Sequence, residues 1–266
     1  MSTGGRREER LVFGEVADVY DRVRPTYPRS LFEEILDSVG EAAAVRALEV
    51  GAGTGKATVA LAEGVGELVA LEPSEDMAAV ARRNTAPFPD VRIEVSSFED
   101  WPVEPASFGL LCSAQAWHWV TPEVRTAKAA EALADGGLLA LFWNTLSLGT
   151  DDLRASIDRV YERRAPGLTS RGPGTGRALS LGEAADELDA SKEFEGARTT
   201  EHPWVGTLGT DDYLALMSTQ SDHRMLEPAT LDALLSDLRT LIDDAGGAIE
   251  SRYVARLVTA RRRTVG

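Results

Sequence analysis

The sequence predicts an α/β protein whose doubly wound, mostly parallel sheet has seven strands and carries helical insertions. Three observations lead to this fold class. Short apolar segments alternate with amphipathic ones over residues 1–145, a glycine-rich turn follows the first apolar segment, and two late segments again look like strands. Such alternation is typical of βαβ units on a parallel sheet. A chain of 266 residues with 43% hydrophobic content can bury a full core.

The first five strands and the helices between them follow from local patterns. Short apolar runs predict strands at 45–50, 67–72, 91–95, 108–114 and 138–143. Amphipathic stretches predict helices at 31–39, 56–65, 77–85 and 122–134. The run Asp135-Gly136-Gly137 is expected to end the last of these helices and to turn the chain into the fifth strand.

Beyond Trp143 the pattern becomes mainly helical. Helices are expected at 151–164, 181–188, 211–217 and 228–244, and strands at 194–205 and 249–262. We therefore predict a core of residues 1–145 that is completed by 194–205 and 247–266. The segments 146–193 and 206–246 would be helical insertions that form a substrate cover. Residues 172–177 repeat the G-x-G-x-G spacing, but no strand precedes them, so a flexible loop is expected there.

The composition narrows the choice of partner and compartment. A formal net charge of −15 argues against nucleic acid, because binding to phosphates needs clustered cations. The single cysteine, Cys112, excludes an internal disulfide and favours a reducing compartment. No export signal and no apolar run long enough to span a membrane are visible. We expect a cytoplasmic monomer or homodimer with a small-molecule partner, and neither nucleic acid nor a membrane as partner.

A glycine-rich turn marks a ligand site after the first strand. Gly51, Gly53 and Gly55 follow Glu49 and precede a predicted helix, so the backbone can bend sharply and a ligand can approach unpaired N–H groups. Lys56 stands where the dinucleotide fingerprint G-x-G-x-x-G needs its third glycine. The phosphate-binding pattern G-x-x-x-x-G-K-[ST] is also absent from this turn.

The second predicted strand ends in an acidic residue, Glu72, about 20 residues past the turn. A carboxylate at this place accepts hydrogen bonds from both ribose hydroxyls of a nucleotide and disfavours a 2′-phosphate. The turn and the acid together predict a site for a nucleotide-type ligand at the carboxyl ends of the first two strands.

Six segments of the chain match a known combination of motifs. They are LEVGAGTGKAT (48–58), LVALEPSEDM (68–77), SSFEDWP (96–102), LLCSAQAWHWV (110–120), ALADGGLLALFWN (132–144) and VYDRVRPTYP (19–28). Together they resemble the class I SAM-dependent methyltransferases, specifically the methyltransferase type 11 group that includes trans-aconitate methyltransferase-like proteins. The resemblance implies a Rossmann-like fold, S-adenosyl-L-methionine as cofactor and S-adenosyl-L-homocysteine as product. Residues 19–28 would cover the cofactor.

The resemblance also implies roles for individual residues. Cofactor contacts are implied for Tyr20, Arg24, Glu49, Gly51, Ala52, Gly53, Glu72, Met77, Ser97, Phe98 and Gln115. Met77 or its neighbour Asp76 would flank the adenine, and Ser97 would lie near the adenine edge, where many relatives have an aspartate. Tyr20 and Arg24 would reach the carboxylate end of the cofactor, since a guanidinium fork matches a carboxylate.

The stretch SAQAWHWV (113–120) begins at the end of the fourth strand. In a doubly wound sheet this strand neighbours the first, so the reacting methyl group would face the stretch. We predict catalytic roles for Trp117, as a pocket wall beside the sulfonium, and for His118, as a general base or an acceptor contact. Trp119, Ser221 and His223 are predicted to bind the substrate. Both tryptophans have the alternative of capping the core.

The sequence therefore predicts a SAM-dependent methyltransferase that acts on an oxygen, sulfur or nitrogen nucleophile of a small molecule, in natural-product or detoxification metabolism. No metal is expected. Two alternatives remain open at this point. One is a thiol S-methyltransferase specifically, and the other is a non-catalytic SAM-binding module with a blocked acceptor pocket.

Overall fold

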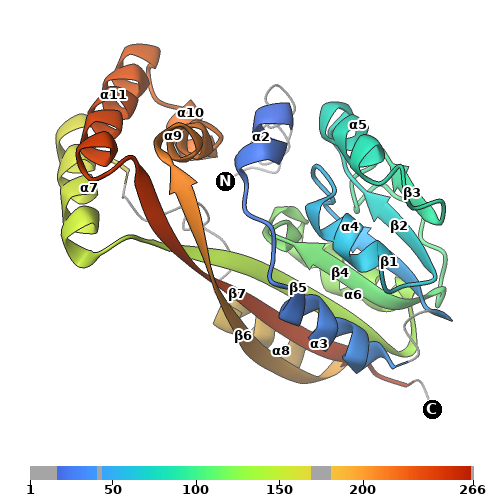
Figure 1. The fold of residues 1–266 in the computed structure, drawn as a ribbon. Coiled ribbons are helices and arrows are strands. Elements are labelled where there is room, and N and C mark those ends of the chain that lie inside the picture. The colour runs from blue at the N-terminus through green and yellow to red at the C-terminus, as the bar shows by residue number, and fades with distance from the viewer. Residues whose placement is uncertain (1–16, 41–43, 169–180, 265–266) are drawn as a thin grey trace.

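A single seven-stranded sheet forms the centre of the protein (Figure 1). The computed structural model describes residues 17–40, 44–168 and 181–264. The strand order is β3-β2-β1-β4-β5-β7-β6. Strands β1 to β5 pair in parallel, and β7 runs antiparallel to both β5 and β6. The predicted fold class is therefore confirmed, and the strand order reverses between β1 and β4, where ligands of such sheets bind.

The elements have the following bounds. The strands are β1 Arg46–Val50, β2 Glu67–Leu71, β3 Val91–Glu94, β4 Phe108–Ala114, β5 Leu133–Leu148, β6 Phe194–Gly209 and β7 Ala248–Arg262. The helices are α2 Ala17–Val23, α3 Arg29–Val39, α4 Lys56–Ala62, α5 Glu75–Asn84, α6 Pro122–Ala132, α7 Asp151–Arg164, α8 Leu181–Ala190, α9 Thr210–Ser218, α10 Ser221–Arg224 and α11 Pro228–Asp244, with the 3₁₀ turn η3 at Trp117–Trp119.

Local chemistry explains why the helices begin where they do. The Ser74 hydroxyl caps α5 by accepting a hydrogen bond from the backbone N–H of Met77. Acidic residues occupy the first turn of α5 and arginines its last turn, which complements the helix dipole. Helix α7 starts in the same way, with Thr150 as its capping residue.

Strand β5 differs from the prediction. It begins at Leu133, because Asp135-Gly136-Gly137 does not end helix α6 but forms an irregularity inside the strand. Phe108 pairs with Leu133 and Leu110 pairs with Leu138, so β5 holds extra residues opposite β4 at this place. Gly136, at φ 75°, supplies the left-handed backbone that the irregularity requires.

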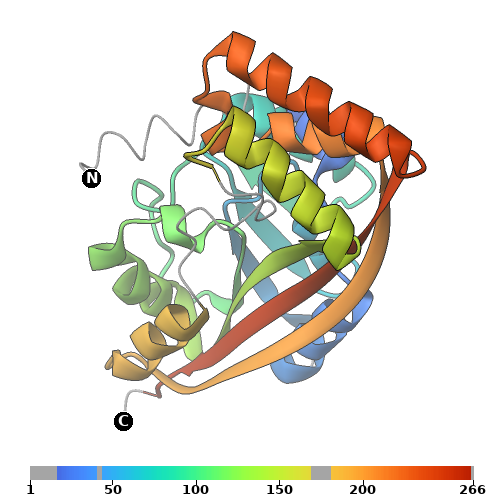
Figure 2. The same ribbon diagram turned by 90° about the vertical axis from the view of Figure 1, so that its left-hand side faces the viewer.

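Strands β5, β6 and β7 also extend well past the rest of the sheet and carry a separate group of helices. Their antiparallel pairing continues to Leu148 opposite Ser251 and to Gly209 opposite Ala248. At this far end α7 and α11 lie side by side (Figure 2). The apolar faces of α7, α9 and α11 close a second core, which includes Tyr161, Tyr213 and Leu238. This group of helices is called the cover below.

Helix α8 corrects the predicted domain division. Residues 146–193 were expected to belong entirely to a substrate cover, but α8 packs on β6 and β7 instead. Ala184 and Leu188 are buried in the main core, and Glu187 forms an ion pair with Arg125 of α6. The apolar face of α8 therefore completes the sheet layer, and the cover consists of α7 with α9 to α11. Residues 172–177, predicted as a flexible loop, lie outside the described residues.

Across the described ranges, no helix is both long and apolar enough to cross a membrane. Within the same ranges, no group of three or more His, Cys, Asp or Glu side chains is placed to hold a metal ion.

Candidate functional site

The three glycines of the turn between β1 and α4 are required for different reasons. All three have left-handed backbone, with φ of 76° at Gly51, 59° at Gly53 and 87° at Gly55. A Cβ on Gly51 would lie 2.3 Å from Cβ of Ala116, and one on Gly55 would lie 3.3 Å from Cα of Ala81. A Cβ on Gly53 would meet nothing within 4 Å. The first and third glycines thus permit packing within the protein, whereas Gly53 keeps open space free for a ligand.

Glu72 follows β2 and lies against this turn. Its Oε2 accepts a hydrogen bond from the backbone N–H of Gly53 at 2.8 Å, and its Oε1 accepts one from the N–H of Ser74 at 2.9 Å. These two donors fix the carboxylate at the carboxyl ends of β1 and β2. A carboxylate held there is placed to accept the two ribose hydroxyls of a nucleoside.

A cleft opens beside the glycine turn. It is lined by Tyr20, Arg24, Pro25, Tyr27, Gly51, Ala52, Gly53, Thr54, Lys56, Ala57, Ala114, Gln115, Asn144, Leu146 and Tyr253. Six of the eleven predicted cofactor residues are among them: Tyr20, Arg24, Gly51, Ala52, Gly53 and Gln115. The lining includes two cations and no carboxylate, although the whole chain carries a net charge of −15. The cleft therefore favours a ligand with an anionic group.

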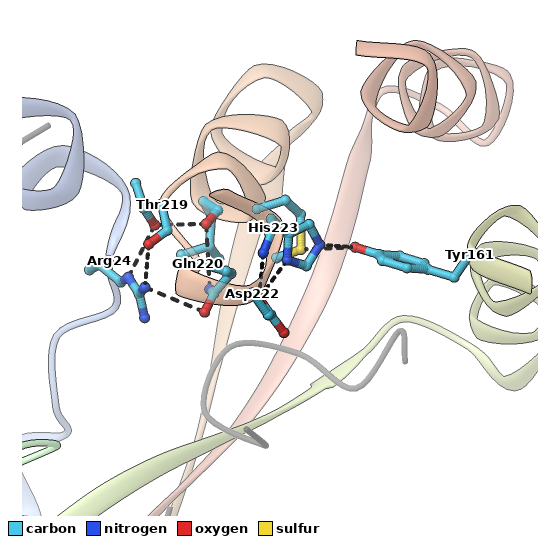
Figure 3. A network of polar contacts seen from close by, with 8 residues as sticks. Arg24, Tyr161, Thr219, Gln220, Asp222 and His223 are labelled. Atoms are coloured by element: carbon cyan, nitrogen blue, oxygen red, sulfur yellow. Dashed lines mark hydrogen bonds and ion pairs between the residues drawn. The ribbon is translucent and has the colours of Figure 1, made fainter. Parts of the chain in front are cut away.

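Arg24 joins the cleft to the cover. Its Nε and Nη2 donate to the hydroxyl and backbone carbonyl of Thr219, at 3.2 and 3.0 Å, and Nη2 also reaches Gln220 (Figure 3). The guanidinium also lies over the ring of Tyr20, 4.7 Å from its centroid. All of these partners are neutral, so they hold the guanidinium in place without cancelling its charge.

Lys56 is the second cation of the cleft. Its Nζ lies 3.8 Å from a carboxylate oxygen of Asp21 on α2. Burial lowers the pKa of Lys56, and the Asp21 carboxylate opposes that effect. Lys56, which stands where a dinucleotide fingerprint has its third glycine, thus joins the start of α4 to α2.

The predicted adenine contacts do not line this cleft. Met77 is buried in a small cluster with Ala17, Val80 and Tyr20. Phe98 is buried in the main core, and the Ser97 hydroxyl donates to Asp100 at 2.7 Å. These three roles remain predictions from the resemblance.

Glu49 lies beneath the glycine turn and is fully buried. Its pKa is raised from 4.5 to about 7, mainly by burial; the Thr58 hydroxyl opposes this rise, and the Glu72 carboxylate adds to it. Neither carboxyl oxygen has a hydrogen-bond partner of ordinary geometry among the described residues. Glu49 is therefore largely protonated in weak acid and becomes an expensive buried charge above pH 7.

This carboxyl makes stability depend on pH. Between about pH 4.5 and 7 the folded protein keeps a proton on Glu49 that the unfolded chain has lost, so stability falls as the pH rises through this window. We expect Glu49→Gln to remove that loss, which amounts to roughly 3 kcal/mol at pH 8. Urea unfolding of both proteins at pH 5 and pH 8 measures it. A constant difference between the two proteins at both pH values would contradict the raised pKa.

The structure corrects the role predicted for Trp117. Its side chain is 0% exposed and belongs to the main core, where it contacts Phe98 with ring centroids 6.2 Å apart. Arg125 donates from Nη1 to the Trp117 carbonyl and lies 5.7 Å from the ring. The turn η3 directs this side chain inward, so Trp117 does not form a wall of the cleft. Trp117 is therefore a core residue, which is the alternative that the sequence left open for both tryptophans.

His118 and Trp119 are half-buried and also do not line the cleft. Their rings lie 4.9 Å apart, and the Trp143 indole N–H is 3.5 Å from Nδ1 of His118. Burial, together with the Arg125 cation, lowers the pKa of His118 to about 4. The imidazole is consequently neutral at neutral pH. The roles in catalysis and acceptor binding stay predictions.

Truncating Trp117 is expected to act on stability. Trp117→Ala should lower the free energy of unfolding by about 3–5 kcal/mol, because a fully buried indole leaves a cavity. Trp119→Ala, two residues along and only half-buried, is the matched variant and should cost less. Urea unfolding curves measure both. Native stability in Trp117→Ala, with methyl transfer lost, would instead favour the pocket-wall role.

His223 also differs from its predicted role in substrate binding. It is 4% exposed, and its ring is held from both sides, by the Asp222 carboxylate 2.8 Å from Nδ1 and the Tyr161 hydroxyl 2.7 Å from Nε2 (Figure 3). Both ring nitrogens are therefore used inside the cover, where His223 ties α10 to α7. Ser221 is the first residue of α10, and its side chain lies outside what the structure describes.

Sequence reasoning missed Tyr27, Asn144, Leu146 and Tyr253 as cleft residues. Tyr27 lies in the segment that was expected to cover the cofactor, so its position was a usable signal. The other three lie on β5 and β7, and only the long-range pairing of these strands brings them to the glycine turn.

Comparison with known proteins agrees with this geometry. Residues 47–137 match a family described as a methyltransferase domain. An uncharacterized methyltransferase of Mycobacterium tuberculosis is 39% identical over 143 residues, which are 54% of this chain and 56% of that protein. A probable S-adenosylmethionine-dependent methyltransferase of Saccharomyces cerevisiae is 30% identical over 54% of this chain and 50% of its own length. The chain thus spans about half the length of the curated relatives it matches.

Solved structures match over more of the chain. One from Anaeromyxobacter dehalogenans, named as a proposed type II methyltransferase, superposes with a TM-score of 0.64 over 90% of this chain and 97% of that one, at 23% identity. A phosphoethanolamine N-methyltransferase of Haemonchus contortus gives a TM-score of 0.56 over 99% of this chain and 61% of that one, at 15% identity. At these identities the likeness concerns the fold.

Proposed function

We propose that the protein is a class I SAM-dependent methyltransferase, because residues 47–137 match a methyltransferase domain, and that it transfers a methyl group from S-adenosyl-L-methionine to a small-molecule acceptor. The observation that carries the proposal is the open space at Gly53 beside the carboxylate of Glu72. The glycine leaves room for a ligand backbone, and the acid is placed for a ribose. Both lie where the strand order of the sheet reverses.

The residues of the cleft fit this cofactor. Gly51 to Gly53 would border its methionine part. Glu72 does not line the cleft but holds the N–H of Gly53, which does, and would accept from the ribose. Arg24, whose hydrogen-bond partners among the described residues are all neutral, would supply a cation for the carboxylate. Bound there, S-adenosylmethionine supplies a methyl group on a positively charged sulfur, so the electrophile is already activated.

The protein's own contribution is to orient the acceptor and exclude water. Tyr27, Leu146 and Tyr253 add largely apolar side chains to the cleft lining. Helix α2, which contributes Tyr20 to the lining, is joined to the start of α4 by the Lys56–Asp21 contact. Holding the nucleophile in line with the carbon–sulfur bond accounts for much of the rate of such a transfer. His118 does not line the cleft and keeps its proposed role as an acceptor contact or base. Its pKa of about 4 leaves the imidazole neutral at pH 7 but also makes it a weak base, so the role of acceptor contact is the better supported of the two.

The proposal is tested by binding first and by turnover second. Calorimetry with S-adenosylmethionine and S-adenosylhomocysteine should give saturable binding of both, and incubation with small-molecule acceptors should release S-adenosylhomocysteine. Binding without any methylated product would favour a non-catalytic SAM-binding module. Absence of binding by either compound would overturn the proposal. A product formed from thiols alone would identify a thiol S-methyltransferase.

A further inference from the structure

Gln115, one of the residues that line the cleft, has a strained backbone. It follows the last residue of β4, and its φ of 57° is left-handed, although it is not a glycine. Side chains with a Cβ rarely adopt this conformation, and such strain concentrates at functional sites. The strain has a visible geometric result, because the turn brings Ala116 against Gly51 of the glycine turn. The kink thus fixes the distance between the end of β4 and the proposed cofactor site.

The side-chain amide of Gln115 is oriented from one side. Its Nε2 donates to the backbone carbonyl of Asn144 at 3.1 Å. A carbonyl only accepts hydrogen bonds, so the NH₂ group must face Asn144, and the amide cannot be turned over. Oε1 is the polar atom that remains, and the described residues offer it no donor. Gln115 lines the cleft, so this oxygen is the polar side-chain atom that the residue can offer to a ligand.

Asn144 is itself held rigidly. Its Nδ2 donates to the carbonyl of Thr26 at 2.7 Å, and its Oδ1 accepts from the indole N–H of Trp204 at 3.2 Å. Trp204 in turn stacks on Tyr253, with ring centroids 4.2 Å apart and planes 13° from parallel. The backbone carbonyl of Asn144 orients Gln115. Its position on β5 is therefore fixed by Thr26 of the segment 19–28, by Trp204 of β6 and by the ring of Tyr253 on which Trp204 stacks.

We propose that Gln115 determines the acceptor class: its Oε1 accepts a hydrogen bond from the acceptor's own N–H or O–H group and aims that atom's lone pair at the methyl group. The inference rests on the proposed function. The nitrogen or oxygen forms a bond to the methyl carbon as the carbon–sulfur bond breaks and S-adenosylhomocysteine leaves. The proton passes to the proposed base His118 or stays on the product and is lost to solvent after release, because an amide oxygen orients a proton without taking it. Gln115 then serves the acceptor and not the cofactor, in contrast to the role that the family resemblance implies.

Two variants separate the strain from the amide. Gln115→Ala and Gln115→Gly both remove the amide, but only the glycine relieves the left-handed strain. We expect the glycine variant to melt about 2–4 °C above the alanine variant. Both variants should bind S-adenosylmethionine within about threefold of the wild-type affinity. Both should also lose at least about tenfold in kcat/KM for the acceptor. Gln115→Asn, which tolerates this backbone and keeps a shorter amide, should recover part of that loss.

The probes are a panel of phenols, alcohols and primary or secondary amines, and a matched panel of tertiary amines and thioethers, which lack the proton. Product from the first panel only supports the proposal. Product from the second panel, no product from either, or unchanged kcat/KM in both variants overturns it, as does a tenfold loss of S-adenosylmethionine affinity. Failure of the wild-type protein to bind S-adenosylmethionine would be a failure of the proposed function, and calorimetry on that protein detects it separately.

Discussion

Gly53→Ala is expected to weaken binding of S-adenosylmethionine by about 5- to 150-fold while the protein stays folded. The added Cβ meets nothing in the protein within 4 Å, so it enters the space proposed for the ligand. Forcing one extra carbon into a well-packed contact costs about 1–3 kcal/mol, which converts to this range of affinity. Titration calorimetry with S-adenosylmethionine measures the change.

The control for Gly53→Ala must introduce the same left-handed backbone strain at a position away from the proposed ligand. Gly196 on β6 has φ of 66°, close to the 59° of Gly53, and a Cβ there also meets nothing within 4 Å. Gly196→Ala should therefore show a similar loss of stability, about 1–2 kcal/mol, with unchanged affinity. Equal affinity in the two alanine variants would show that Gly53 does not border the cofactor. Gly51→Ala should behave differently from both, because its Cβ collides with Ala116 and disturbs the fold itself.

Glu72→Ala is the second substitution with a large expected effect. Losing a charged hydrogen-bond partner costs about 1.5–3 kcal/mol, or about 10- to 150-fold in affinity for S-adenosylmethionine. The nearby variant Glu75→Ala is the matched control, because this carboxylate is exposed on the first turn of α5 and pairs with Arg82. It should bind the cofactor as the wild-type protein does.

A comparison of ligands makes the ribose contact specific. The wild-type protein should bind S-adenosylhomocysteine more tightly than its 2′-deoxy analogue, and Glu72→Ala should bind the two equally. Such a cycle isolates the contact between one carboxylate and one hydroxyl from any general damage to the site. A preference that persists in the variant would assign the hydroxyl to another residue.

The parts of the site that depend on local sequence were predictable. The glycine turn and Glu72 lie at strand ends that hydrophobic pattern and spacing define, and the structure brings them within one hydrogen bond of each other. Trp117 was not predictable in the same way. A run of three bulky residues in a 3₁₀ turn shows where the strand ends, but which of the three turns inward depends on Arg125 and α8.

The cleft wall required long-range information as well. Asn144 lies opposite Ala255, and Leu146 lies opposite Tyr253, so each pair joins residues more than a hundred positions apart. No local pattern encodes this register. Long-range pairing also explains why the start of β5 was predicted wrongly. Its glycines resemble a helix stop, but pairing with β4 lets an irregular strand continue through them.

The position of β7 has a consequence for how the chain folds. Although it comes after all the other described strands in the sequence, β7 is not at the edge of the sheet but between β5 and β6. During synthesis β5 and β6 are complete before β7, their shared neighbour, exists. Until β7 arrives, the edge of each strand that will pair with it has unpaired backbone N–H and C=O groups. Docking of β7 then closes loops that contain every helix of the cover. We infer that the first four strands can collapse early, whereas the wall of the cleft on β5 and β7 forms in a late, slow step that is most exposed to aggregation.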